Sequence, residues 1–470
     1  MSKVLISKEK LDTLSETIKI KSNKTNNLTI DEMNDAVLNI TSGDSSINGL
    51  IKNYKVHAGE NISAGDFVEF VHAVSDILQE KNLRTLSNGV LIENNKVFVV
   101  GQYYDGTSYY LYGTVVEING TTMTATGSIL HSVDNTNFYC ASCILLENGK
   151  VFIPYSCGSD RYLYGTIVEI NGTTMTATNA TLNETANICY NNYPTCVLLE
   201  NNKVFIAHSS SSSRYLYGTI VEINGTTMTA TYTTQISTTS NLAYYPGQII
   251  KLASNRVFIP ASNGSGSNKY LYGIIVTIDG GTMACSTKSL SVMSYDFITP
   301  RCVLLENNKI FVAYSNSNNS GTGELYGIIV VVDGTTMTPT SQRLNMHSGS
   351  TKGSPCCVLL ENNKVLIAHA YSVFYRLYGT VVEINGTTMT AKTVPLNETD
   401  NTANDRPDII LLENNKAFIV HNHRSSGYLY GTIFETDKPF VKKYQKNIDG
   451  VANTSGGEGE NLLVYVPNVQ

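Results

Sequence analysis

The tripeptide Leu-Tyr-Gly returns seven times along this chain at nearly constant spacing. Its glycines are Gly113, Gly165, Gly218, Gly273, Gly327, Gly379 and Gly431, at intervals of 52, 53, 55, 54, 52 and 52 residues. A repeat of about 50 residues is typical of the four-stranded blades of β-propellers, whereas the common helical repeats run at about 33 to 47. Seven copies therefore predict a seven-bladed β-propeller.

Each copy contains the same four short segments rich in Val, Ile, Thr, Tyr and Phe. In the third copy they are 196–200, 203–208, 215–223 and 226–231. Asn-Asn or Asn-Gly separates the first segment from the second and the third from the fourth, and these dipeptides favour the positive φ angles of tight hairpins. The sequence thus predicts an all-β fold of four-stranded antiparallel blades. Both faces of the first and third segments are largely apolar, which suits a sheet packed between two neighbours.

The two ends of the array predict a closed ring. The last copy breaks at Asp437-Lys-Pro, where each earlier copy has its fourth segment. Ahead of the first copy, residues 66–78 form an extended apolar stretch. We expect this stretch to close blade seven, so that the propeller covers 66–438 and leaves only short, protected sheet edges.

The flanking regions predict two further parts. Residues 1–42 are expected to be a helical segment for attachment or oligomerisation, because 8–24 has a helical apolar stripe and Thr29-Ile-Asp-Glu32 is a capping box. A linker is expected at 43–53. The Gly-punctuated segments 54–71 and 440–470 are expected to meet as a small split β domain into which the propeller is inserted.

Composition narrows the classes of partner. The net charge of −6 and the lack of a basic stripe argue against nucleic acid. We expect neither a signal peptide nor membrane insertion, because no apolar run is long enough. Four of the nine cysteines, Cys143, Cys196, Cys302 and Cys357, fall at one position of the repeat, where a small buried residue fits. No disulfide, metal or cofactor is therefore expected.

The repeat contrasts two faces of the ring. The short turns are nearly identical, whereas the loops at the opposite end of the blades vary between copies, as expected of binding loops on a rigid frame. Candidate ligand-binding residues on that variable face are Tyr103, Tyr104, Asp105, Tyr139, Tyr155, Asp160, Arg161, Tyr190, Tyr193, His208, Arg214, Tyr244, Tyr245, Tyr295, Asp296, Tyr314, His369, Tyr371, Phe374, Asp405, Arg406, His421, His423 and Arg424. Aromatic planes beside amide, hydroxyl and charged groups suit carbohydrate.

Two other hypotheses about the function stay open. Glycoside cleavage needs two carboxylates about 5 to 10 Å apart, and Asp105, Asp160, Asp296, Asp405 and Asp408 are available on the loops. We nevertheless assign no catalytic residue, because the chain has no HExxH, no phosphate-binding Gly-rich loop and no Gly-x-Ser-x-Gly turn. The propeller could also be a purely structural element.

The N-terminal region resembles a known class of protein. The helix, the Lys/Thr/Asn turn and the run Leu-Thr-Ile-Asp-Glu-Met-Asn-Asp-Ala-Val (28–37) resemble the start of tail proteins from phages of Gram-positive, particularly clostridial, bacteria. Gly65-Asp-Phe-Val with Gly450-Val-Ala and Val464-Tyr-Val resembles small β modules of phage structural proteins.

The resemblance implies a virion protein assembled in the host cytoplasm. It implies that the N-terminal part attaches to other tail or baseplate proteins, and that the distal part meets a glycan or protein of the host cell surface. A homotrimer is expected by analogy alone. The expected function is thus a receptor-binding tail protein, with a polysaccharide-cleaving tail enzyme and a structural virion component as alternatives.

Overall fold

The computed structural model describes one small β-sheet and most of a ring. Described are 51–55, 67–71, 73–435 with gaps, 440–443, 450–452 and 461–465. The gaps are 80, 82, 94, 133–136, 141, 159, 186–187, 190–193, 211–214, 238–244, 263–268, 294–299, 307, 318–322, 345–351, 362, 371–374, 398–405, 414 and 424. The predicted N-terminal helices lie outside the described residues.

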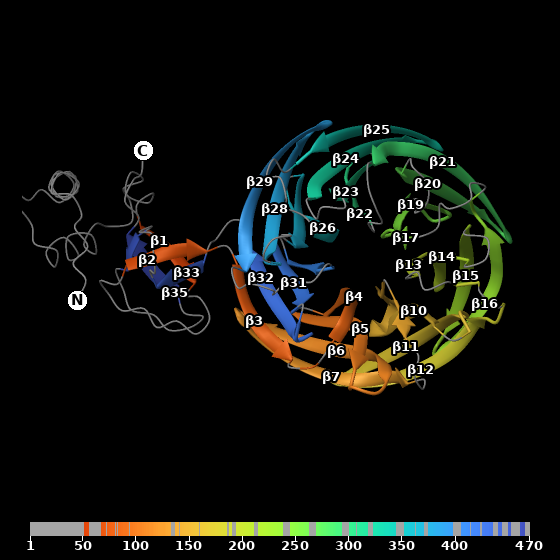
Figure 1. Ribbon diagram of the computed structural model, residues 1–470, viewed down its shortest axis with the longest axis horizontal. Helices are drawn as coiled ribbons and strands as arrows, with labels where there is room; N and C mark the ends of the chain where they lie inside the picture. The colour runs from red at the N-terminus through yellow and green to blue at the C-terminus, as the bar shows by residue number, and fades with distance from the viewer. Residues whose placement is uncertain are drawn as a thin grey trace, which may run out of the picture. The chain divides into compact units, whose positions relative to one another are not determined.

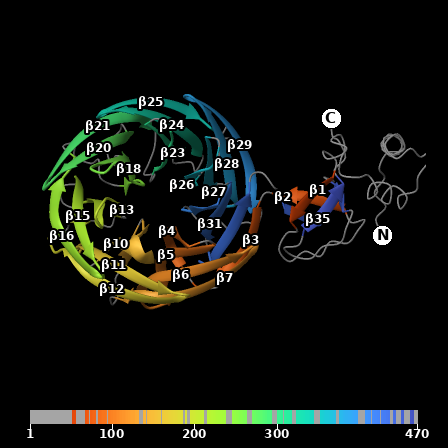
Figure 2. The same ribbon diagram turned by 180° about the vertical axis from the view of Figure 1, so that it is seen from behind.

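The ring consists of seven antiparallel sheets, one for each copy of the repeat, as the sequence predicts. In Figure 1 they stand around a centre, with β4, β13 and β22 innermost and β7, β16 and β25 at the rim. Figure 2 shows the same ring from behind. We letter the strands of a blade a to d from the centre outward.

Strand bounds follow the repeat closely in blades one, three and five. Blade one has β4 (Leu83–Glu93), β5 (Lys96–Tyr104), β6 (Tyr109–Asn119) and β7 (Thr122–Ser132). Blade three has β13 (Thr195–Leu198), β14 (Lys203–Ser209), β15 (Leu216–Asn224) and β16 (Thr227–Gln235). Blade five has β22 (Arg301–Leu304), β23 (Lys309–Ser317), β24 (Gly323–Asp333) and β25 (Thr336–Arg343).

In two of the remaining blades strand a is divided. Blade two has β8 (Phe138–Tyr139), β9 (Ile144–Leu145), the 3-10 turn Glu147–Gly149, β10 (Val151–Cys157), β11 (Leu163–Asn171) and β12 (Thr174–Asn183). Blade four has β17 (Tyr245–Pro246), β18 (Ile250–Ala253), β19 (Arg256–Ser262), β20 (Lys269–Asp279) and β21 (Thr282–Met293). Blade six is undivided, with β26 (Lys352–Leu359), β27 (Lys364–Ala370), β28 (Leu377–Asn385) and β29 (Thr388–Asn397).

Blade seven takes strands from both ends of the array. Its order is β3-β32-β31-β30, so that β3 (Ala73–Gln79) supplies strand d beside β32 (Leu429–Glu435), β31 (Lys416–Asn422) and β30 (Asp408–Glu413). The predicted stretch 66–78 is divided between two sheets, because Phe67–Val71 pairs with the small sheet and only the part from residue 73 pairs with β32. The ring therefore begins later than the predicted residue 66.

Contacts between blades seven and one close the ring. The Gly89 N–H donates to Asp408 Oδ2 at 2.7 Å, and Asn422 Nδ2 donates to the Leu83 carbonyl at 2.9 Å. Met123 of blade one lies over Gly431 of blade seven, with its Sδ 2.8 Å from where a Cβ would stand. The seventh blade thus packs on the first in the way that neighbouring blades pack on each other.

The core lies between the blades. One cluster joins Phe98 and Val115 of blade one to Cys143 and Ile153 of blade two, and similar clusters join the following pairs up to blades six and seven. None of the nine cysteines, all of which the structure describes, forms a disulfide, and only Cys285 is exposed. Burial raises the pKa of the Cys196 thiol to about 12, so this side chain behaves as a small apolar group.

The second unit is a five-stranded sheet built from both flanks of the ring. Its order is β1-β35-β34-β2-β33. The bounds are β1 (Ile51–Lys55), β2 (Phe67–Val71), β33 (Phe440–Lys443), β34 (Gly450–Ala452) and β35 (Asn461–Tyr465). Strand β1 starts inside the predicted linker 43–53, because Ile51 pairs with Tyr465 in the sheet. That end of the linker was predicted wrongly.

Candidate binding face

The a–b turns of all seven blades and the c–d turns of blades one to six lie at the same end of the blades, which we call the turn face. In blade three Asn202 has φ 55° and Gly225 has φ 65°, angles that Asn and Gly adopt more readily than other residues. The Ile223 N–H donates to the Asn202 carbonyl at 3.0 Å and ties the two turns together. The b–c loops and d–a connections lie at the opposite end, which we call the loop face.

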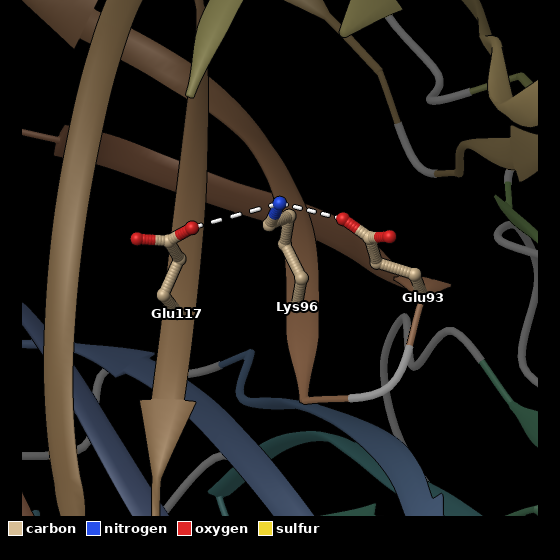
Figure 3. A network of polar contacts seen from close by, with 3 residues as sticks. All are labelled: Glu93, Lys96 and Glu117. Carbon is tan, nitrogen blue, oxygen red and sulfur yellow. Dashed lines mark hydrogen bonds and ion pairs between the residues drawn. The ribbon is translucent and has the colours of Figure 1, made fainter. Parts of the chain in front are cut away.

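Charged side chains on the turn face pair with one another. In blade one Lys96 Nζ lies 2.5 Å from Glu93 Oε1 and 3.5 Å from Glu117 Oε1 (Figure 3). The same b–c pair recurs as Lys150–Glu169 at 2.7 Å, Lys203–Glu222 at 2.9 Å and Lys364–Glu383 at 3.4 Å. Such exposed pairs add little stability, but they neutralise the recurring charges of this face. A shallow hollow in blade two is lined by one of these pairs with Gly149, Ile170, Asn171, Thr174 and Thr176.

Five predicted binding residues at the end of strand b are buried inside the blades. Their exposed fractions are 0% for Tyr155, 0% for His208, 2% for Tyr314, 1% for His369 and 0% for His421. The prediction that these side chains lie on an exposed face is wrong. Strand pairing continues past the apolar run, as in the pair His208–Tyr217, so the side chain stays between blades.

The three histidines make the same contacts in their blades. His208 Nε2 lies 2.8 Å from Thr219 Oγ1, which lies 2.9 Å from Thr233 Oγ1, so the bonds link strands b, c and d. The imidazole stacks on the motif tyrosine Tyr217, with ring centroids 6.0 Å apart. Burial lowers the pKa of His208 and His369 to about 4. His208 and His369 are therefore neutral packing groups rather than surface ligands.

The b–c hairpin of blade one carries four half-buried tyrosines. Tyr103 lies opposite Tyr110 and Tyr104 opposite Tyr109, with ring centroids 5.8 and 4.6 Å apart. Asp105 is exposed at the tip and fixes the loop between these strands. Its Oδ2 accepts a hydrogen bond from the Tyr110 hydroxyl at 2.8 Å. This hairpin brings the predicted Tyr103, Tyr104 and Asp105 together.

A second predicted group lies on the loop face of blade two. Asp160 Oδ2 accepts from the Tyr164 hydroxyl at 2.5 Å, and its Oδ1 accepts from the Tyr162 N–H at 3.0 Å. Arg161 follows with φ 60°, an uncommon angle for arginine. Tyr139 on β8 is half-buried, and its hydroxyl accepts from Asn137 Nδ2 at 3.3 Å.

The other candidates fall into two groups. Arg406 and His423 are half-buried, and His423 Nδ1 accepts hydrogen bonds from the Ser425 and Ser426 N–H groups at 3.3 and 3.2 Å. Tyr245 of β17 pairs through its backbone with Ser262 of β19. Outside the described residues lie Tyr190, Tyr193, Arg214, Tyr244, Tyr295, Asp296, Tyr371, Phe374, Asp405 and Arg424.

The carboxylates weighed for glycoside cleavage lie in unlike surroundings. Hydrogen bonds from the Ser108 and Thr107 N–H groups lower the pKa of Asp105. Asp408 is 4% exposed, and burial raises its pKa although Arg301 opposes the shift. Asp105 is at a loop tip and Asp408 binds the Gly89 N–H at the ring closure.

In the described part of the chain, no three His, Cys, Asp or Glu side chains lie close enough together to form a metal site. That part also contains no helix with the length and hydropathy of a membrane span.

Three residues in or against the blade one hairpin are absent from the predicted set. Tyr109 and Tyr110 form the second strand of the tyrosine pairs, and Lys81 Nζ lies 5.2 Å from the Tyr103 ring centroid. The run 103–110, Tyr-Tyr-Asp-Gly-Thr-Ser-Tyr-Tyr, has an Asp-Gly turn signal between two tyrosine pairs. That symmetry is the sequence signal that could have found Tyr109 and Tyr110.

Comparison with known proteins concerns the fold. The sequence matches no protein-family model and no curated protein. Among solved structures, this chain is similar to a Dyadobacter fermentans protein of unknown function, at 11% identity over 78% of this chain and 99% of that one, with a TM-score of 0.46. The NanB sialidase of Streptococcus pneumoniae matches at 12% identity over 82% of this chain and 71% of that one, with a TM-score of 0.44. A fungal alcohol oxidase in complex with copper matches at 10% identity over 88% and 94%, with a TM-score of 0.48. The strand order of this chain is that of a seven-bladed β-propeller.

Proposed function

We propose that this protein binds a host cell-surface glycan through the loop face of its propeller. The observation that carries the proposal is the contrast between the two faces. The turn face repeats the same turns and pairs its own charges. On the loop face, blade one presents the tyrosines of a rigid hairpin, and blade two adds Tyr139, Asp160 and Arg161.

The chemistry of these groups fits a carbohydrate. A pyranose has an apolar face that packs on an aromatic ring, and its rim of hydroxyl groups needs donors and acceptors. Tyrosine supplies both a flat ring and a hydroxyl. Because the blade one hairpin stands on a closed ring of packed blades, its tyrosines are held in position without help from the ligand, which lowers the entropic cost of binding.

The setting we propose for this activity is a phage tail. The resemblance of 28–37 and of the flanking β segments to phage structural proteins supports this setting. The N-terminal region would attach the protein to other tail or baseplate proteins, a homotrimer would be its assembly, and the propeller would meet the host. The mature protein would then be a virion component made in the host cytoplasm.

The test is to incubate the full chain with cell walls and purified surface polysaccharides of clostridial strains. Both retention of the protein and release of new reducing ends are followed. We expect the protein to be retained without release of reducing ends. Retention should be lost when the b–c loops of blades one and two are each replaced by the b–c loop of another blade. A matched control replaces an a–b turn, which leaves retention unchanged.

Two other outcomes would overturn the proposal. Release of reducing ends would make the protein a polysaccharide-cleaving tail enzyme and direct attention to the loop carboxylates. No retention on any wall or polysaccharide, together with normal host adsorption by particles that lack the ring, would make the propeller a structural element.

A further inference from the structure

We infer that the blade one hairpin is a stacking subsite for one pyranose unit, on the side formed by Tyr104 and Tyr109. This inference rests on the proposed function and names the part of the loop face that carries it. The hairpin comprises the end of β5, the loop 105–108 and the start of β6. It contributes four tyrosines in two cross-strand pairs.

The two sides of the hairpin are not equivalent. Because side chains alternate along a strand, Tyr104 shares a side with Phe98 and Val100, and Tyr109 shares that side with Leu111 and Val115. Those four residues belong to the core cluster between blades one and two. The Tyr104–Tyr109 pair therefore continues the blade two side of the sheet beyond the packed core, and Tyr109 itself lies against that core.

Lys81 covers the other side. Its Nζ lies 5.2 Å from the ring centroid of Tyr103 and 5.0 Å from that of Tyr112, within the range of a cation–π contact. Tyr103 also stacks on Tyr110, and Tyr112 is only 2% exposed. These rings already have partners within the protein. The pair Tyr104–Tyr109 lies on the opposite side of the sheet from Lys81, in line with the apolar side chains of the core cluster, which suits the apolar face of a sugar.

The loop holds the pair in place before any ligand binds. Asp105 Oδ1 accepts from the Thr107 N–H, the Thr107 hydroxyl and the Ser108 N–H, each at 2.8 Å. The Tyr104 hydroxyl donates to the Gly106 carbonyl at 2.6 Å. Together with the hydrogen bond from the Tyr110 hydroxyl to Asp105, these make five hydrogen bonds that fix the four-residue loop 105–108. A ring fixed in this way loses little conformational freedom when a ligand stacks on it.

Blade two places polar groups beside the subsite. Tyr139 and Asn137 come from the connection that enters this blade, and Gln102 Nε2 of the blade one hairpin donates to Asn137 Oδ1 at 3.4 Å. The Gly158 N–H of the next loop donates to the Asn137 carbonyl at 3.0 Å. The loop of blade two is thus joined to the base of the hairpin through Asn137 and Gln102, and Gln102 is on the same side of the strand as Tyr104.

The test measures binding of full-chain variants to a purified clostridial wall polysaccharide that retains the wild type. Tyr104→Ala and Tyr109→Ala are each expected to weaken binding about tenfold, equivalent to about 1.4 kcal/mol. Tyr109→Phe keeps the ring and is expected to bind within about twofold of the wild type. The control is Tyr232→Ala, which removes a half-buried tyrosine on β16 whose hydroxyl donates to the Gly280 carbonyl at the turn face.

The outcomes separate this inference from the proposed function. If both alanine variants fold, as judged by the unfolding midpoint, and bind like the wild type while loop replacements in other blades abolish binding, the hairpin subsite is wrong and the glycan-binding face stands. If Tyr109→Phe loses as much as Tyr109→Ala, the hydroxyl rather than the ring acts and stacking is wrong. If the wild type binds no polysaccharide, both fail.

Discussion

In five of the seven Leu-Tyr-Gly motifs the glycine lies where side chains from two blades meet, namely at Gly165, Gly218, Gly273, Gly327 and Gly431. A Cβ on Gly218 would stand 2.7 Å from Phe205 Cε2 of its own blade and 2.7 Å from Met283 Sδ of the next. At Gly431 the equivalent neighbours are Phe418 and Met123, across the ring closure. The motif glycine is therefore a contact point between blades, which explains why it recurs with the Gly-Thr-Met segment.

Replacing this glycine should loosen the contact between two blades. Gly218→Ala is expected to lower the stability of the ring by about 1 to 3 kcal/mol, because the added methyl group must displace Phe205 or Met283. The matched control is Gly281→Ala, whose nearest contact would be Tyr232 at 3.9 Å, and which should change stability by less than about 1 kcal/mol. The midpoints of thermal unfolding of the two variants test this expectation. Equal midpoints would show that a methyl group at the motif glycine does not destabilise the ring.

The buried histidines make ring stability depend on pH. His208 and His369 have pKa values of about 4 in the fold, lowered by burial, against 6.5 when exposed. Between these values the unfolded chain binds a proton that the folded chain does not, so stability is full above about pH 6.5 and is lost as the pH falls toward 4. Each histidine contributes a slope of up to about 1.4 kcal/mol per pH unit.

The double variant His208→Gln, His369→Gln isolates this effect. Carboxylates titrate in the same window, so the quantity to measure is the difference between variant and wild type in the slope of unfolding free energy against pH from 6.5 to 4. We expect the slope of the variant to be shallower, because the variant takes up as many as about two fewer protons on unfolding than the wild type does. Parallel curves would show that these imidazoles do not titrate on unfolding.

Strand β3 is the element on which ring closure depends. Val74 is fully buried, and Ser75 Oγ lies 2.7 Å from Thr432 Oγ1, which in turn lies 2.8 Å from His421 Nε2. In blade three the corresponding hydroxyl partner is Thr233 of strand d. A serine from the N-terminal side of the array therefore reproduces in blade seven the contact that strand d makes elsewhere.

Two substitutions on this strand test its role as a latch. Val74→Ala is expected to destabilise the ring by about 2 kcal/mol, since it removes two buried methyl groups. Ile77→Ala, at a residue that is 43% exposed on the same strand, should change stability by about 0.5 kcal/mol or less. Hydrogen exchange in blades seven and one, measured alongside unfolding, should rise only in the first variant. Faster exchange confined to β3 would contradict the latch.

At the scale of strands, the sequence was most informative where periodicity and turn residues agree. The repeat period, the Asn and Gly turns and the missing last strand together predicted the blades and the strand from the N-terminal side. The ends of the strands are harder to predict from the sequence. The place of His208 after an apolar run predicts an exposed side chain, but pairing with Tyr217 continues and the two neighbouring blades cover both sides of the sheet. Alternation cannot distinguish inside from outside when both sides are buried.

At the scale of the whole molecule, the ring combines a uniform face with a variable one. The meander puts b–c loops and d–a connections at one end of all seven blades, and the sequence predicted that division. It could not predict which loop residues lie together, because that depends on contacts such as Asn137 with Gln102, between blades. The loop face can therefore be predicted from the repeat, whereas the contacts between blades are known only from the fold.

The most direct test of the account blocks one face of the ring at a time. In a Cys285→Ser background, where the remaining cysteines are buried, a bulky thiol-reactive group is attached to Thr107→Cys and Ser425→Cys on the loop face. A second protein in the same background carries the same group on Asn119→Cys and Asn385→Cys of the turn face. All four positions are exposed. Retention on clostridial wall polysaccharide is measured before and after labelling. The account predicts that labelling abolishes retention only on the loop face; loss confined to the turn face would contradict it.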